Sequence, residues 1–218
     1  MTTTTSATGA TPSESKPSSW TLRLRQAIDR HLPMDHLLPD RQPYYVGSWV
    51  YVFGVVTIAA LVWVVISGVV LAFMGPQWWH DSRTGRFFNG LHFWSVQLFF
   101  IFIVLHLWGQ YFMAGWRHGR AATWAIGVVI FGVSVLTAFT GYLSQQNFDA
   151  QFIAINAKDA MNAGGIGAFF NVLNFGQMYG LHIMLLPIGV TILVVVHIVL
   201  VRLRGVVKPI DPEGGAPS

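Results

Sequence analysis

Four apolar segments separated by more polar connections set the pattern of the chain. We expect them over residues 46–74, 90–114, 122–143 and 178–203, and no charge interrupts their interiors. Each is long enough for a helix to cross a bilayer, which takes about 20 residues. The pattern predicts an all-α membrane protein, built as a four-helix transmembrane bundle.

The apolar segments divide the chain into three parts. Residues 1–42 begin with a stretch rich in Thr, Ser and Pro that has no apolar core. We expect a cytoplasmic tail followed by a surface amphipathic segment there, and no cleavable signal peptide. Residues 43–209 form the four-helix domain and residues 210–218 a C-terminal tail. The longest connection, 144–177, contains a glycine-rich stretch, and a loop of that length is usually functional or disordered.

Composition supports a membrane protein. Of the 218 residues, 53% are hydrophobic and 10% are charged, whereas a soluble domain carries about 25% charged residues. The basic residues lie at the ends of the apolar segments, which favours membrane topology over nucleic-acid binding. The chain has no cysteine, which excludes disulfides, thiolate-bound iron–sulfur clusters and covalently attached c-type haem.

The distribution of basic residues predicts the orientation, because cytoplasmic loops carry an excess of Lys and Arg. Ten fall on the side that holds both termini, against three on the other side. We therefore expect a multi-pass protein of the plasma (cell inner) membrane with both termini cytoplasmic and the 144–177 connection outside. The ten are Lys16, Arg23, Arg25, Arg30, Arg41, Arg117, Arg120, Arg202, Arg204 and Lys208, and the three are Arg83, Arg86 and Lys158.

Four of the eight histidines lie inside apolar segments: His92 and His106 in the second, His182 and His197 in the fourth. An ionisable side chain at membrane depth is costly and indicates a functional site by default. The spacings are 14 and 15 residues. Each pair therefore lies on one face of its helix, with its members about 21–22 Å apart along the axis.

The two histidine-bearing helices run in the same direction, so the histidines match in depth. His92 and His182 lie near the outer surface, and His106 and His197 lie deeper. Two such pairs form the ligand set of two non-covalent b-type haems, and bis-histidine ligation leaves no open position, so these haems carry electrons. Taken singly, each histidine also fits an interfacial or hydrogen-bonded helix residue. Zinc fits poorly, because ligands about 21 Å apart on one helix cannot share an ion.

Glycines repeat with the period of the histidines. Gly54 and Gly68 in the first segment are 14 residues apart, and so are Gly127 and Gly141 in the third. Glycine in a membrane helix allows another group to approach the backbone closely. The shared period indicates four notches for two macrocycles, while ordinary helix packing is the alternative for any single glycine.

From about Pro43 to Pro209 the sequence resembles the N-terminal half of cytochrome b from quinol-oxidising bc-type complexes. The resemblance rests on the histidine and glycine spacings, on Thr140-Gly141-Tyr142, and on Leu181-His182 followed by Leu186-Pro187. The length and the 15-residue spacing resemble the split form, in which a separate subunit supplies the remaining helices. The resemblance implies a low-potential outer haem on His92 and His182, and a high-potential inner haem on His106 and His197. It also matches Arg202 to a basic residue at the inner quinone and haem-propionate region.

The sequence departs from the family pattern in three ways. The run Leu143-Ser144-Gln145-Gln146-Asn147 stands where the family usually has Pro-Trp or Pro-Asp near the outer quinol site. Asn89 stands three positions before the first histidine, where an Arg commonly pairs a haem propionate, and Arg83 and Arg86 are nearby substitutes. The cysteine that tethers an extra haem in chloroplast-type members is missing.

The resemblance implies a transmembrane electron-transfer subunit of a quinol oxidoreductase complex of a respiratory chain. Electrons would pass from an outer quinol site through two b haems to the inner face. The expected partners are iron–sulfur and cytochrome subunits, a separate C-terminal-half cytochrome b subunit, quinone and membrane lipid, in a hetero-oligomer that can also be dimeric. No residue of this chain is expected to be catalytic by itself. The alternatives are a di-haem membrane anchor linking quinone to a peripheral dehydrogenase, and a haem-free transporter or structural subunit.

Overall fold

The computed structural model describes residue 20, residues 26–27 and residues 49–208. Contacts within the chain divide it into two units, Met1–Pro43 and Tyr44–Ser218, and all the helices named below lie in the second. The predicted tails fall outside the described residues, apart from residues 20 and 26–27.

The second unit is helical, and no β-strand occurs within its described residues. Four of its helices are long and apolar enough to cross a membrane, as the sequence pattern predicts. The fourth span is continuous through three labelled parts, α8, η2 and α9. The helices are α3 (Trp49–Met74), α4 (Pro76–Asp81), α5 (Arg83–Phe112), α6 (Ala121–Leu143), α7 (Phe148–Ala163), α8 (Phe175–Gly180), η2 (Leu181–Leu185) and α9 (Leu186–Arg204).

Helix α5 begins at Arg83, well before the apolar segment expected from residue 90. The Ser82 side chain caps it by accepting the N–H of Gly85 at 2.8 Å, and this satisfies one of the free donors of the first turn. Arg83 and Arg86 make these first turns polar, so a search for apolar runs overlooks them. The additional turns bring Asn89 onto the same helix as His92.

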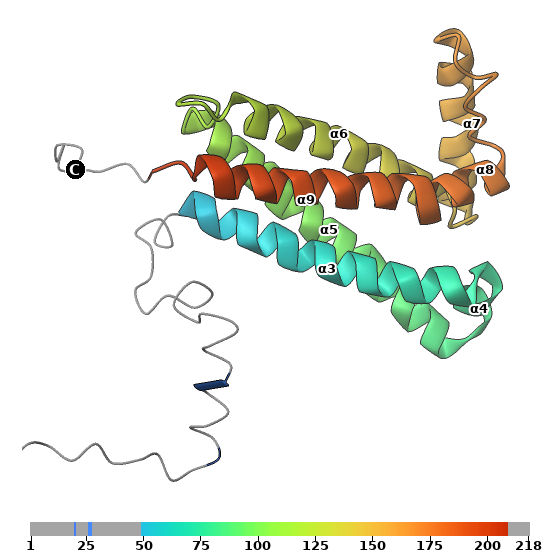
Figure 1. The fold of residues 1–218 in the computed structure, drawn as a ribbon. Helices are drawn as coiled ribbons and strands as arrows, with labels where there is room; N and C mark the ends of the chain where they lie inside the picture. The colour runs from blue at the N-terminus through green and yellow to red at the C-terminus, as the bar shows by residue number, and fades with distance from the viewer. Residues whose placement is uncertain (1–19, 21–25, 28–48, 209–218) are drawn as a thin grey trace, which may run out of the picture. The chain divides into compact units, whose positions relative to one another are not determined.

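The long outer connection also contains a helix, α7. The Asn147 side chain caps it by accepting the N–H of Ala150 at 2.8 Å, and the chain turns after it at Gly165, where φ is +76°. Ala154 of α7 packs into a small core with Leu143 and Met178. Figure 1 shows α7 beside α8, directed away from the bundle. The connection is therefore ordered structure anchored on α6 and α8.

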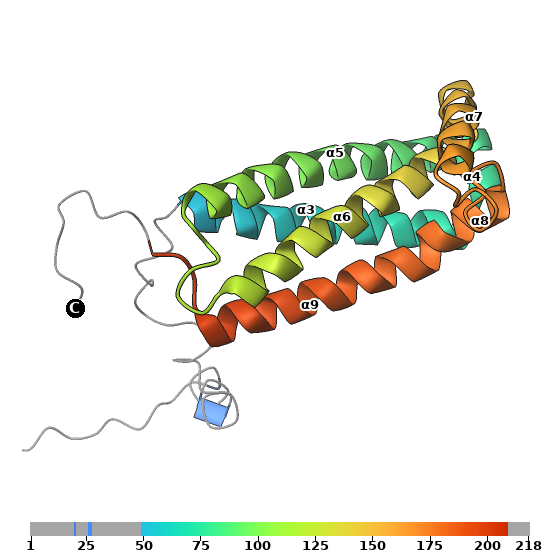
Figure 2. The ribbon, with the colours of Figure 1, turned by 90° about the horizontal axis from the view of Figure 1, so that it is seen from above.

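The bundle is made of two helix pairs, with α3 packed along α5 and α6 packed along α9 (Figures 1 and 2). Helices α5 and α9 run in the same direction. A buried core cluster joins α3, α5 and α6 halfway along the bundle. One of its members, Phe99, lies seven residues from both His92 and His106, so the cluster is a buried apolar layer between the two histidine levels. The cluster consists of Ala60, Phe99, Ile103 and Ile130.

Large apolar side chains cover the outside of the bundle, as expected when the solvent is lipid. Trp63 of α3, Trp108 of α5 and Ile192 of α9 are each more than half exposed. Helix α9 buries the least of its surface within the chain. The four spans therefore satisfy their backbone internally and leave their apolar faces to lipid or to other membrane helices.

Candidate functional site

The structure brings His92 of α5 and His182 of η2 together across the outer half of the bundle. Their ring centroids are 6.2 Å apart and their planes cross at 81°. Both side chains are partly buried. His92 and His182 therefore lie at the same depth, as the sequence pattern predicts.

The outer pair fits a metal ion held between the two rings. A metal–imidazole bond is about 2 Å long, and with about 1.1 Å from nitrogen to ring centroid the two centroids should be roughly 6.2 Å apart. The separation of the two rings therefore matches that of two histidines that would hold one metal ion between them. Within the described residues, no three His, Asp or Glu side chains gather into a conventional metal site.

The hydrogen bonds of His92 and His182 use the Nδ1 atom of each ring and leave Nε2 free to bind a metal. His92 Nδ1 lies 3.1 Å from the Val64 carbonyl, and His182 Nδ1 lies 2.9 Å from the Thr137 carbonyl. A carbonyl only accepts, so each Nδ1 carries the proton and each Nε2 keeps a lone pair for a metal. Such a contact fixes the tautomer and the ring orientation of a metal ligand.

Ser67 adds a second acceptor to His92 alone. Its hydroxyl is fully buried, donates to the Trp63 carbonyl at 2.6 Å, and lies 3.1 Å from His92 Nδ1. Because the hydroxyl proton is already used, the oxygen accepts from the ring. The sequence pattern did not single out Ser67, although it directly precedes Gly68 and therefore borders one of the predicted notches.

Each histidine ring lies against one glycine of a facing helix. A Cβ built on Gly68 would come within 3.0 Å of His92 Cε1, and one on Gly54 within 3.1 Å of His106 Cε1. The closest approach is at Gly141, where a Cβ would lie 2.7 Å from His182 Nδ1. A real Cβ does not approach other atoms this closely, so the backbone there has room only for hydrogen. The structure places the histidine imidazole rings against the glycines that the sequence pattern predicted as notches for the macrocycles.

The inner pair repeats this arrangement with looser contacts. A Cβ on Gly127 would lie 3.3 Å from His197 Cε1. The Nδ1 atoms of His106 and His197 are buried without a hydrogen bond, although they face the carbonyls of Val50 and Thr123. All four histidines thus face the carbonyl four residues before their glycine, since Val50, Val64, Thr123 and Thr137 precede Gly54, Gly68, Gly127 and Gly141 by four.

A π-helical turn explains the unequal histidine spacings. Pro187 has no N–H to donate, and the Leu186 N–H bonds to the Leu181 carbonyl five residues earlier. A π turn takes one more residue than an α turn, which removes about 100° of helical rotation. The 15 residues from His182 to His197 therefore cover the same rotation as the 14 from His92 to His106.

A cavity of about 400 Å³ opens between the helices at the outer level. His92 and His182 both line it, and the rest of its wall is apolar apart from hydroxyls. Ser134 Oγ is buried on this wall without a hydrogen-bond partner. The cavity is a space for a largely apolar cofactor between two imidazoles. Its wall also includes Gly68, Phe99, Phe100, Thr137, Pro187 and Val190.

The basic residues that the resemblance implies as partners of haem carboxylates lie at the ends of the bundle. Arg202 is exposed near the end of α9. The Arg86 guanidinium donates to the His80 carbonyl at 3.0 Å. Asn89 lies on the same face of α5 as His92, one turn before it, and its amide bonds to Gln145.

Replacing Gly141 with alanine should displace the His182 ring and reduce haem occupancy at the outer level while leaving the inner level loaded. Gly132→Ala on the same helix is the matched control, because a Cβ there meets nothing within 4 Å and alanine favours a helix over glycine by about 1 kcal/mol. Haem content after purification measures both variants. Equal occupancy in the two variants would refute the importance of the Gly141 contact.

Deleting Met184 should convert the π turn to an α turn and leave both histidine levels intact, because its side chain is exposed and the turn contains one extra residue. Deleting Ile101 is the matched change on α5, which has no π turn between its histidines, so His106 should rotate by about 100°. Haem content should stay normal in the first variant and fall in the second. A comparable loss in both would contradict this role of the π turn.

Comparison with known proteins shows which family of proteins this chain resembles. The profile of the family described as Cytochrome b(N-terminal)/b6/petB matches residues 97–214, which include His106, His182 and His197. Cytochrome b6 of Heliomicrobium gestii is 28% identical over 143 residues, covering 60% of this chain and 66% of that protein. The menaquinol:cytochrome c reductase cytochrome b subunit of Bacillus subtilis (strain 168) is 24% identical over 201 residues, covering 81% of this chain and 90% of that protein.

Two longer proteins are similar to this chain over part of their length. The cytochrome bc complex cytochrome b subunit of Chlorobaculum thiosulfatiphilum is 26% identical over 202 residues, and the match spans 46% of that protein. A chain of the solved structure titled Hyperthermophilic respiratory Complex III has the same fold, with a TM-score of 0.71 and 20% identity over 88% of this chain and 59% of that one. With more than half of its length matched by the family profile, this chain belongs to the family of N-terminal cytochrome b and cytochrome b6 proteins.

Proposed function

We propose that the chain is the transmembrane electron-transfer subunit of a quinol oxidoreductase complex. Electrons would enter from a quinol site at the outer face and leave at the inner face through two non-covalent b-type haems. The observation that carries the proposal is the repeated unit of a histidine ring seated on a glycine, which occurs twice at each of two depths. The named relatives, which are cytochrome b6 and cytochrome b subunits, support it over a membrane anchor for a dehydrogenase.

The histidines would act as fixed axial ligands. His92 and His182 would hold the outer haem, and His106 and His197 the inner one. At the outer level, the carbonyls of Val64 and Thr137 accept from Nδ1 and leave each Nε2 with a free lone pair for iron. A haem with two axial imidazoles supplies reversible one-electron transfer.

The rest of the bundle would keep the two sites separate and dry. The layer of Ala60, Phe99, Ile103 and Ile130 fills the space between the histidine levels, which lie about 21 Å apart along α5. Gly54, Gly68, Gly127 and Gly141 would serve the haems by letting the ligand rings approach the backbone. Arg202 would attract anionic groups of an inner haem or quinone to the end of α9.

Other subunits of the complex would supply the further electron acceptor that this chain lacks. Quinol gives up two electrons, and each haem accepts one. Without cysteine the chain cannot itself bind an iron–sulfur cluster by thiolates. The expected partners are therefore an iron–sulfur subunit, a cytochrome subunit and a C-terminal-half cytochrome b subunit, and the exposed apolar face of α9 is available for membrane contacts.

The purified chain should contain two non-covalent haems. Histidine replacement should remove them by level, with His92→Ala or His182→Ala abolishing the outer haem and His106→Ala or His197→Ala the inner one. A pyridine haemochrome assay gives the stoichiometry, and redox titration assigns the level that is lost. His118→Ala is the control, because that side chain is exposed in the loop after α5. A wild-type chain with fewer than two haems would refute the proposed function.

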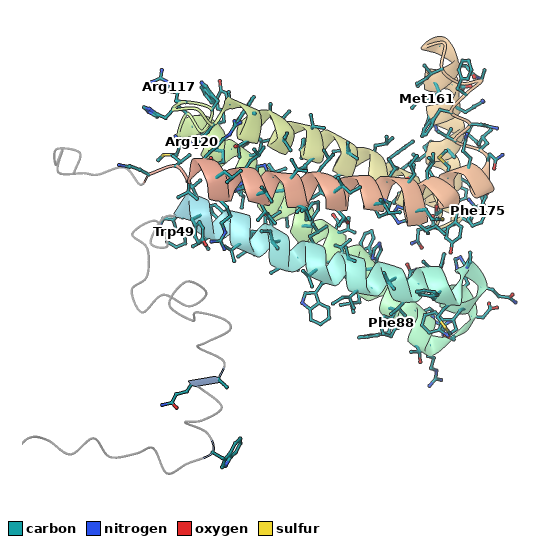
Figure 3. All side chains as sticks on the ribbon, in the orientation of Figure 1. Trp49, Phe88, Arg117, Arg120, Met161 and Phe175 are labelled. Atoms are coloured by element: carbon teal, nitrogen blue, oxygen red, sulfur yellow. The ribbon has the colours of Figure 1, made fainter. Side chains whose placement is uncertain are left out.

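We also propose that both termini are cytoplasmic and that the membrane is the plasma membrane. Figure 3 shows Arg117 and Arg120 at the end of the bundle near Trp49, with Phe88 and Phe175 at the opposite end. Basic residues favour the cytoplasmic side, and the connection from α5 to α6 carries both arginines. The end that bears α7 would then face outward.

The chain has no cysteine, so single cysteines can report its topology. An impermeant thiol reagent applied to intact cells should label Asp159→Cys on α7 and leave Arg117→Cys unlabelled until the cells are opened. The charge distribution is the physical reason for this result. The reverse labelling pattern would invert the proposed direction of electron flow.

A further inference from the structure

A reciprocal amide pair joins α5 to the end of α6. The Asn89 Nδ2 donates to Gln145 Oε1 at 3.0 Å, and the Gln145 Nε2 donates to Asn89 Oδ1 at 2.9 Å. Both side chains are partly buried. Each amide therefore uses a donor and an acceptor on the other, so the pair needs no charge or water to hold it.

The pair lies one helical turn outside the outer histidine site. Asn89 precedes His92 by three residues, which places the two on the same face of α5. Gln145 follows Gly141 by four residues, and Gly141 is the position against which the His182 ring lies. The pair thus connects the helix that carries one ligand to the helix that seats the other.

Such a connection matters because the two helix pairs make few direct contacts with each other. Helix α5 packs mainly on α3, and α6 packs mainly on α9. The cavity of about 400 Å³ lies between the pairs just inside the amides. A deeper contact between the Phe100 and Phe131 rings, at 6.4 Å, joins α5 to α6 but has no directional hydrogen bond. The amide pair therefore restrains the width of the cavity at its outer end.

Among the described residues, the neighbouring polar side chains do not compete for the hydrogen bonds of Asn89 and Gln145. Arg86 on the same helix donates to the His80 carbonyl, and Gln146 donates to the Leu143 carbonyl within its own turn. Separating α5 from α6 would leave both amides without these hydrogen bonds, which is unfavourable where water has limited access. Hydrogen bonds between membrane helices join them in this way.

We propose that the Asn89–Gln145 pair is a positioning clamp that sets the spacing of α5 and α6 and thereby the relative orientation of the His92 and His182 rings. The inference rests on the proposed function, because its consequence is read on the outer haem. Opening the clamp lets α5 move relative to Gly141, which changes the angle between the two ligand planes. Hydrogen bonding around the ligands and distortion of the macrocycle are among the ways in which a protein tunes a haem. The inner site, about four turns deeper along α5, keeps its geometry.

The test compares apolar replacements with an exchange of the two amides. Asn89→Leu and Gln145→Leu each leave one amide without its partner. The double variant Asn89→Gln with Gln145→Asn exchanges the lengths of the two side chains and keeps both hydrogen bonds possible. Gln146→Leu is the matched control, since Gln146 lies next to Gln145 and its side chain donates to the Leu143 carbonyl instead of to α5. Each variant of the full chain is purified with its haems, and the midpoint potentials and ferric EPR spectra of both haems are recorded.

Each single leucine variant should shift the outer-haem potential and its EPR signal, or reduce its occupancy, and leave the inner haem unchanged. The exchanged double variant should restore the wild-type outer signal, and Gln146→Leu should match wild type throughout. An unchanged outer haem in both single variants would overturn the clamp, as would an exchanged variant no better than the single ones. A wild-type chain without two haems would instead overturn the proposed function, so the two failures are distinguishable.

Discussion

The contact of an imidazole ring with a helix backbone at a glycine is the constraint on which the rest of the structure depends. In a helix, the carbonyl of residue i−4 and the Cα of residue i lie on one face, one turn apart. A glycine at i removes the Cβ that would fill this space, so a histidine can lie flat there with Nδ1 toward the carbonyl. His182 against Gly141 and Thr137 shows the unit in its tightest form. The Nε2 atom is then left with a free lone pair.

Four repeats of this unit account for the architecture. Two glycines on α3 receive the histidines of α5, and two on α6 receive those of η2 and α9, so each helix pair is internally close-packed. The space left between the pairs is the cavity at the outer level. An apolar layer around Phe99 closes it toward the inner level. The same packing leaves the lipid-facing surfaces apolar and the polar residues at the ends of the spans.

The sequence predicted the parts of this structure that depend on local pattern. The four spans follow from apolar length, and the site follows from histidines and glycines repeating at 14 or 15 residues. The π turn was not predicted, although the extra residue before His197 and the proline at 187 were its signals. Asn89 and Gln145 were noted only as separate departures from a family pattern. Their pairing depends on how α5 and α6 meet, a contact between residues far apart in sequence that no local pattern encodes.

If His92 and His182 hold one haem iron, as proposed, their rings would cross nearly at right angles, as they do in the structure. Ligand planes crossed in this way leave two d orbitals of a low-spin ferric iron almost equal in energy, which makes its EPR signal strongly anisotropic. The measurement is therefore the EPR spectrum of the oxidised chain, recorded alongside His182→Ala. The account predicts a strongly anisotropic low-spin signal that the substitution removes. A high-spin signal, or a low-spin signal of the kind given by parallel imidazoles at this site, would contradict it.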